Sequence, residues 1–122
     1  SLSMPQRMRR QAFLGALTAV YGDGRVTVIP DFSLEKPSTK ALITELAKSE
    51  IPSRRTLLVI GEADEAIMRS GDNLPQFEVV SAGYLSTLAV LTATRLVFTE
   101  SGLRATAERV ARPESGRRGG EL

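Results

Sequence analysis

The 122-residue chain contains no cysteine, no histidine and no tryptophan. Without cysteine it can form no disulfide, thiolate nucleophile or cysteine metal site. Without histidine it lacks the commonest general base, the Ser-His-Asp triad and the ordinary zinc ligands. With only two tyrosines and four phenylalanines, it is not expected to stack bases on an aromatic platform. These absences argue against most classes of enzyme, and we expect no cofactor and no metal.

The sequence also contains no long apolar run, and we expect no signal peptide. No apolar segment approaches the roughly 20 residues that a bilayer-spanning helix requires, so we expect no contact with a membrane. The apolar content of 42% and the charged content of 25% are typical of a globular protein. A length of 122 residues fits one domain.

Segments that favour strands alternate with segments of helical periodicity. Strands are predicted at residues 25–30, 56–60, 76–80 and 95–99, and helices at 5–21, 39–49, 63–70, 85–92 and 101–111. This alternation predicts an α/β fold, a three-layer α/β/α domain with a parallel sheet of about four strands over residues 1–111. The glycine, proline and charge of residues 112–122 predict a disordered basic tail.

Three arginines crowd the first turn of the first predicted helix, at Arg7, Arg9 and Arg10. The positive end of the helix macrodipole lies there, so each guanidinium raises the energy by a few tenths of a kcal/mol. An anionic partner would remove that cost. The alternative is that these arginines are simply a solvated face.

Two further segments carry candidate chemistry. Residues 37–40 read Pro-Ser-Thr-Lys, and a helix start with hydroxyls and a lysine either holds a phosphate or only caps itself. Glu62, Asp64 and Glu65 follow a predicted buried strand, at the sheet edge where open α/β proteins bind ligands. These carboxylates either hold magnesium beside a phosphate or only complement a helix dipole.

Several short motifs occur in the order and spacing of a known family. They are Met4-Pro-Gln-Arg-Met-Arg-Arg-Gln-Ala12, Gly24-Arg-Val-Thr-Val28, Pro37-Ser-Thr-Lys-Ala41, Leu57-Leu-Val-Ile60, Asn73-Leu-Pro75 and Leu96-Val-Phe-Thr99. Together they resemble the family of ribosomal large-subunit protein four over roughly residues 2–110. The chain departs from the family by lacking an N-terminal segment and a long basic loop, so we expect a fragment or a short form.

The resemblance implies a structural, non-catalytic protein of the large ribosomal subunit. Its expected partners are large-subunit rRNA and neighbouring ribosomal proteins, in a bacterial-type ribosome of the cytoplasm or of an organelle. An apolar face left uncovered by the missing segment would favour self-association. The implied RNA-binding residues are Arg7, Arg9 and Arg10 on phosphate, Lys36, Ser38, Thr39 and Lys40 as a second anchor, and Asn73 at a turn or on RNA.

Two other functions are compatible with the residues alone. One is a small magnesium-dependent enzyme that handles phosphate through Glu62, Asp64 and Glu65. The other is a protein-protein interaction module that uses an exposed face of the sheet.

Overall fold

The computed structural model describes residues 6–111, and the tail predicted at residues 112–122 lies outside them. No helix in the described part is both long enough and apolar enough to cross a membrane. The elements are α1 (Gln6–Gly22), β1 (Val26–Ile29), α2 (Thr39–Ala47), β2 (Thr56–Ile60), α3 (Glu65–Gly71), β3 (Phe77–Ser81), the short 3₁₀ helix η1 (Ala82–Tyr84), α4 (Thr87–Thr92), β4 (Leu96–Thr99) and α5 (Glu100–Ala111).

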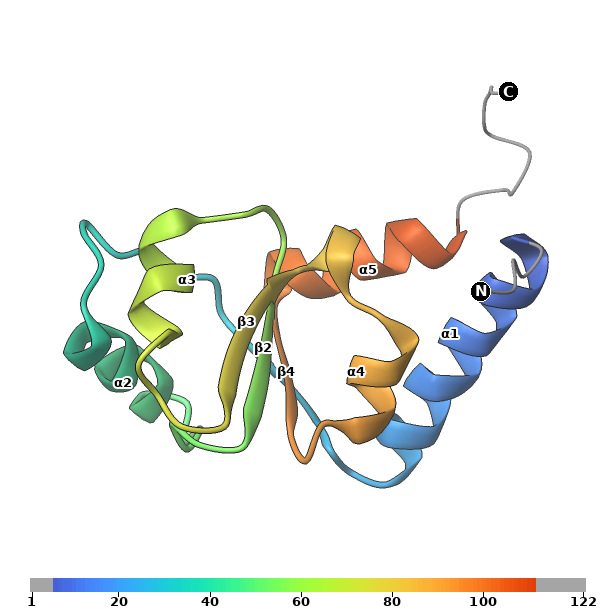
Figure 1. The fold of residues 1–122 in the computed structure, drawn as a ribbon, viewed down its shortest axis with the longest axis horizontal. Helices are drawn as coiled ribbons and strands as arrows, with labels where there is room; N and C mark the ends of the chain where they lie inside the picture. Colours follow the sequence, from blue (N-terminus) through green and yellow to red (C-terminus); the bar gives the residue numbers. More distant parts are fainter. Residues whose placement is uncertain (1–5, 112–122) are drawn as a thin grey trace.

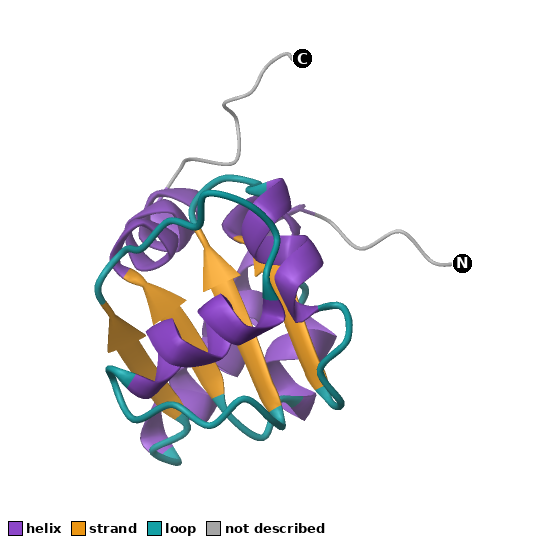
Figure 2. Cartoon of the chain, turned by 90° about the vertical axis from the view of Figure 1, so that its left-hand side faces the viewer, coloured by secondary structure: helices purple, strands orange, loops and turns teal. Residues whose placement is uncertain are grey.

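The four strands form one parallel sheet in the order β1-β4-β2-β3. Helices α2 and α3 cover one face, and α1, α4 and α5 cover the other (Figures 1 and 2). The predicted three-layer α/β/α arrangement is therefore confirmed. All four strands point the same way, so their first residues meet at one edge of the sheet and their last residues at the opposite edge.

Strand β2 lies inside the sheet and is buried along its whole length. Because successive side chains of a strand point to opposite faces, Leu57 and Val59 pack against the layer of α1, α4 and α5. Leu58 and Ile60 pack against α2 and α3. Each such side chain contributes about 1.5–3 kcal/mol through burial, so the sheet core joins the two helical layers.

Some strand and helix boundaries differ from the predicted ones because of the local backbone conformation or a capping hydrogen bond. Gln76 has φ 53°, which a strand residue does not adopt, so β3 begins one residue later than predicted. The predicted helix at 85–92 begins at Thr87 because Ser86 Oγ accepts from the amide of Ala89 at 3.0 Å. Leu85 is buried in the core instead, and η1 was not predicted from the sequence.

Candidate nucleic-acid interface

The N-terminal turn of α1 presents two exposed arginines, Arg7 and Arg9. Helix α1 has no acidic residue in its first turn, so nothing within that turn offsets the positive end of the dipole. The opposite face packs Phe13, Ala16 and Val20 into the core. Packing thus fixes the helix and directs Arg7 and Arg9 to the surface.

Arg10 differs from these two arginines because it is half-buried. Its Nε donates to the carbonyl oxygen of Val110 at 2.7 Å, which ties the start of α1 to the end of α5. Arg10 therefore has a structural contact that was not predicted from the sequence.

At the start of α2, both hydroxyls of the predicted anchor take part in internal contacts. Ser38 Oγ accepts from the amide of Ala41 at 3.1 Å as the helix N-cap. The Ser38 amide donates to Ser70 Oγ at 2.7 Å, and Thr39 Oγ1 donates to the Ser70 carbonyl oxygen at 2.9 Å. These bonds join α2 to α3. Lys36 and Lys40 remain exposed beside them.

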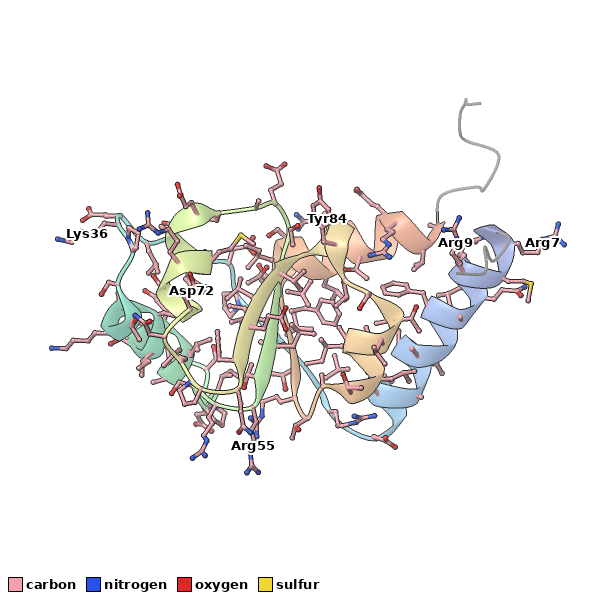
Figure 3. All side chains as sticks on the ribbon, in the orientation of Figure 1. Arg7, Arg9, Lys36, Arg55, Asp72 and Tyr84 are labelled. Carbon is pink, nitrogen blue, oxygen red and sulfur yellow. The ribbon has the colours of Figure 1, made fainter. Side chains whose placement is uncertain are left out.

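The structure does not bring the predicted RNA-binding residues into one site. In Figure 3, Arg7 and Arg9 lie at one end of the longest axis and Lys36 lies near the other. Asn73 is exposed in the loop between α3 and β3, at the edge of the sheet where the strands begin. The predicted RNA-binding residues thus lie at separate places on the surface.

The acidic residues after β2 cap and flank a helix. Asp64 Oδ1 accepts from the amide of Ile67 at 3.2 Å as the N-cap of α3, and Glu65 forms an exposed pair with Arg69 at 3.7 Å. Within residues 6–111, no three acidic, histidine or cysteine side chains are placed to hold a metal ion. The helix-dipole alternative accounts for Asp64 and Glu65.

Asp31 caps α5 from the loop that follows β1. Its Oδ1 accepts from the amide of Ser101 at 3.0 Å and from Ser101 Oγ at 2.9 Å. These bonds, the amide bond above all, lower the pKa of Asp31 below its ordinary value. A carboxylate at a helix N-terminus also complements the dipole.

We expect the Asp31→Ala variant to lose about 1 kcal/mol of unfolding free energy at pH 7. Because the folded pKa of Asp31 lies below the unfolded one, its stabilisation is complete above about pH 4 and is lost as the pH falls through the folded pKa. Urea denaturation at pH 7 and pH 3 measures this: the difference between variant and parent should shrink at pH 3. An equal difference in unfolding free energy at both pH values would show that the charge of the Asp31 carboxylate does not stabilise the fold.

A row of arginines marks the edge of the sheet where the strands begin. Arg25 directly precedes β1, Arg95 precedes β4 and Arg55 precedes β2. Figure 3 shows Arg55 at this amino edge, with Tyr84 at the opposite, carboxyl edge. The sequence pattern alone does not indicate that these arginines lie together.

Large exposed apolar side chains occur on several elements. On α4, Leu88 is 70% exposed and Leu91 is also exposed; Tyr84 of η1 is 82% exposed. Val28 is exposed on the edge strand β1. Self-association through an uncovered apolar face stays a prediction.

Comparison with known proteins gives one consistent result. A sequence model of the ribosomal protein L4/L1 family matches residues 1–109. The relative named large ribosomal subunit protein uL4 from Christiangramia forsetii is 35% identical to this chain, and the match covers 80% of this chain and 47% of the relative. The protein of the same name from Pelotomaculum thermopropionicum is 33% identical, and the match covers 84% of this chain and 49% of that relative. The protein of the same name from Mycoplasma capricolum is 28% identical, and the match covers 87% of this chain and 51% of that relative. The chain thus spans about half the length of the curated relatives it matches.

Proposed function

Because this chain belongs to the ribosomal protein L4/L1 family, we propose that it is a structural component of the large subunit of a bacterial-type ribosome in the cytoplasm. In this role it binds large-subunit rRNA, contacts neighbouring ribosomal proteins and catalyses no reaction. The observation that carries the RNA-binding part is the exposed arginine pair, Arg7 and Arg9, on the positive end of α1.

The physical argument for α1 rests on its position and charge. Two exposed guanidinium groups and the partial positive charge of a helix N-terminus favour the same anion. Arginine also binds phosphate oxygens through two parallel hydrogen bonds. Such contacts fix the position of the protein on RNA and carry little sequence information. Arg10 supports this surface by tying α1 to α5.

The start of α2 supplies the second proposed anchor. Lys36 and Lys40 are exposed, and their ammonium groups make no hydrogen bond or ion pair with other residues of the range 6–111. We assign phosphate binding chiefly to these two lysines, with Ser38 and Thr39 holding the turn in place through Ser70. Asn73 is exposed and offers an amide to RNA from a separate loop.

A magnesium-dependent enzyme has weaker support. Asp64 uses one carboxylate oxygen for the cap of α3, and Glu65 lies in the first turn of that helix beside Arg69. The residues from 6 to 111 offer no group of side chains suited to a metal ion. The family match also favours a structural ribosomal protein.

Replacing Arg7 and Arg9 together by alanine should weaken binding to large-subunit rRNA. Because this variant can no longer neutralise two phosphates, the slope of log K against log salt should become shallower by up to about 1.8. Titration of labelled rRNA with the full chain at several salt concentrations measures both effects.

The matched control replaces two other exposed arginines, Arg69 and Arg104. This control removes the same charge from α3 and α5, so general electrostatic attraction falls equally. If the two double variants weaken binding alike, the arginines of α1 are a solvated face and the assignment of that surface is wrong.

A further inference from the structure

The residues that precede the four strands form a continuous row. In the spatial order β1-β4-β2-β3 they are Arg25, Arg95, Arg55 and Gln76. Neighbouring strands lie about 4.8 Å apart, so the sheet itself sets the spacing of three arginines. Arg54 adds a fourth from the same loop as Arg55.

Two of these arginines hold the row together. Arg95 Nη1 donates to the carbonyl oxygen of Arg54 at 3.1 Å and to Thr56 Oγ1 at 3.3 Å. Arg25 Nη1 donates to the carbonyl oxygen of Ala93 at 2.7 Å, and Arg25 pairs with Asp23. Arg54 and Arg55 are exposed, and the Arg54 guanidinium has no hydrogen bond or ion pair with the described part of the chain. Arg95 thus positions the loop that presents Arg54 and Arg55, and Arg25 holds the neighbouring loop that leads into β4.

Charge is divided between the two edges of the sheet. The loops at the amino edge, residues 23–25, 48–55, 72–76 and 93–95, carry five basic and three acidic side chains. The loops at the carboxyl edge, residues 30–38, 61–64 and 82–86, carry one basic and four acidic side chains. The loops of the amino edge therefore attract a polyanion more strongly than the loops of the carboxyl edge, where open α/β folds ordinarily bind ligands.

Arg55 and Gln76 adopt an unusual backbone conformation side by side. Their φ values are 55° and 53°, in the left-handed region that L residues adopt at a cost and glycine adopts without one. The two are joined because Arg55 Nε donates to Gln76 Oε1 at 3.2 Å and the Thr56 amide donates to the Gln76 carbonyl oxygen at 3.1 Å. Strained residues of this kind concentrate at binding sites, and both line an open hollow of about 490 Å³.

We propose that Arg54 and Arg55 bind the phosphate backbone of an RNA strand that runs along the amino edge of the sheet. This inference rests on the proposed function and adds to it a surface distinct from α1 and from the start of α2. The RNA crosses the starts of β4, β2 and β3, with Arg25 and Arg95 holding the loops beneath it. The acidic carboxyl edge faces away from it.

The test measures binding of the full chain to purified bacterial large-subunit rRNA. Replacing Arg54 and Arg55 together by alanine should lower the affinity roughly tenfold and make the salt slope shallower by about 1.4–1.8. The Arg69→Ala, Arg104→Ala double variant again serves as the control for the lost charge, and we expect it to lose much less affinity and to keep a steeper salt slope. Equal behaviour of the two double variants would overturn the proposal.

A second variant separates binding from folding. Arg55→Gly removes the charge and also relieves the left-handed backbone, so its melting temperature should stay equal or rise while its affinity for rRNA falls. Unchanged affinity in this well-folded variant would contradict a role for Arg55. If the parent chain itself does not bind the rRNA, the proposed function fails; if the parent binds and these variants bind equally well, the amino-edge surface alone is wrong.

Discussion

The Gly102→Ala variant should lose at least about 3 kcal/mol of unfolding free energy, at the upper end of the cost of overpacking a core. A Cβ at position 102 would lie 2.3 Å from the carbonyl oxygen of Val59 and 2.9 Å from its carbonyl carbon. Both atoms belong to the backbone of β2, a strand inside the sheet, so neither can rotate away. Either α5 must move off the sheet or β2 must bend, and a Cβ would also lie 3.1 Å from Thr99 Oγ1, the atom that accepts the Gly102 amide at 3.0 Å.

Gly15 supplies the control for this experiment. It lies within α1, and a Cβ built there meets no atom within 4 Å. Gly15→Ala should therefore stabilise the chain, by up to about 1 kcal/mol, because alanine is the better helix former. Thermal melts of both variants measure the contrast, and a fall of Tm on the order of 15 °C is expected for Gly102→Ala. Similar melting temperatures would show that α5 and β2 do not pack as closely as the Cβ distances require.

Arg109→Ala is the second substitution with a large expected effect, about 2–4 kcal/mol of unfolding free energy. Arg109 Nη1 donates to the carbonyl oxygens of Ala82 and Leu85, each at 2.8 Å. Its guanidinium also lies over the ring of Phe13, 4.2 Å from the centroid. One side chain of α5 thus joins η1 and α1, and its removal leaves two carbonyl oxygens and a packed ring without their partner.

Two further variants separate the contacts of Arg109 from the effect of its charge alone. Arg104→Ala removes an exposed arginine from the same helix and should change the unfolding free energy by less than about 0.5 kcal/mol. Arg109→Lys keeps the positive charge but loses the planar group that bonds two carbonyls at once, so it should recover only part of the stability. Urea denaturation measures all three, and full recovery by lysine would show that charge alone matters.

The strands and layers could be predicted because the order of apolar residues encodes the core. The continuous apolar run of β2 predicts a strand covered on both faces, and Leu57 and Leu58 do pack on opposite layers. The alternation of strands and helices then requires a parallel sheet. The predicted helix boundary differs from the structure where a single side chain caps the helix, as Ser86 does at the start of α4.

The site could be predicted less well because its side chains depend on partners distant in the chain. Ser38 and Thr39 contact Ser70, more than thirty residues away, and Arg10 contacts Val110, one hundred residues away. No local pattern encodes these pairings. Residues that cap or tie elements therefore could not be separated from residues that offer charge to a partner.

The arginine row at the amino edge did leave a signal in the sequence. An arginine directly precedes each of β1, β2 and β4, and the first residues of parallel strands share one edge. What the sequence does not contain is the strand order, which places Arg95 between Arg25 and Arg55. It also does not reveal that Arg95 holds the loop while Arg54 remains exposed.

The most direct test of the ribosomal role is a competition between the large-subunit and small-subunit rRNA of one bacterium for the full chain. At near-physiological salt, we predict tighter binding to the large-subunit rRNA than to the small-subunit rRNA. We also expect log K for the large-subunit rRNA to fall linearly as the logarithm of the salt concentration rises. Equal affinity for both rRNAs, or an affinity that does not change with salt, would contradict this role.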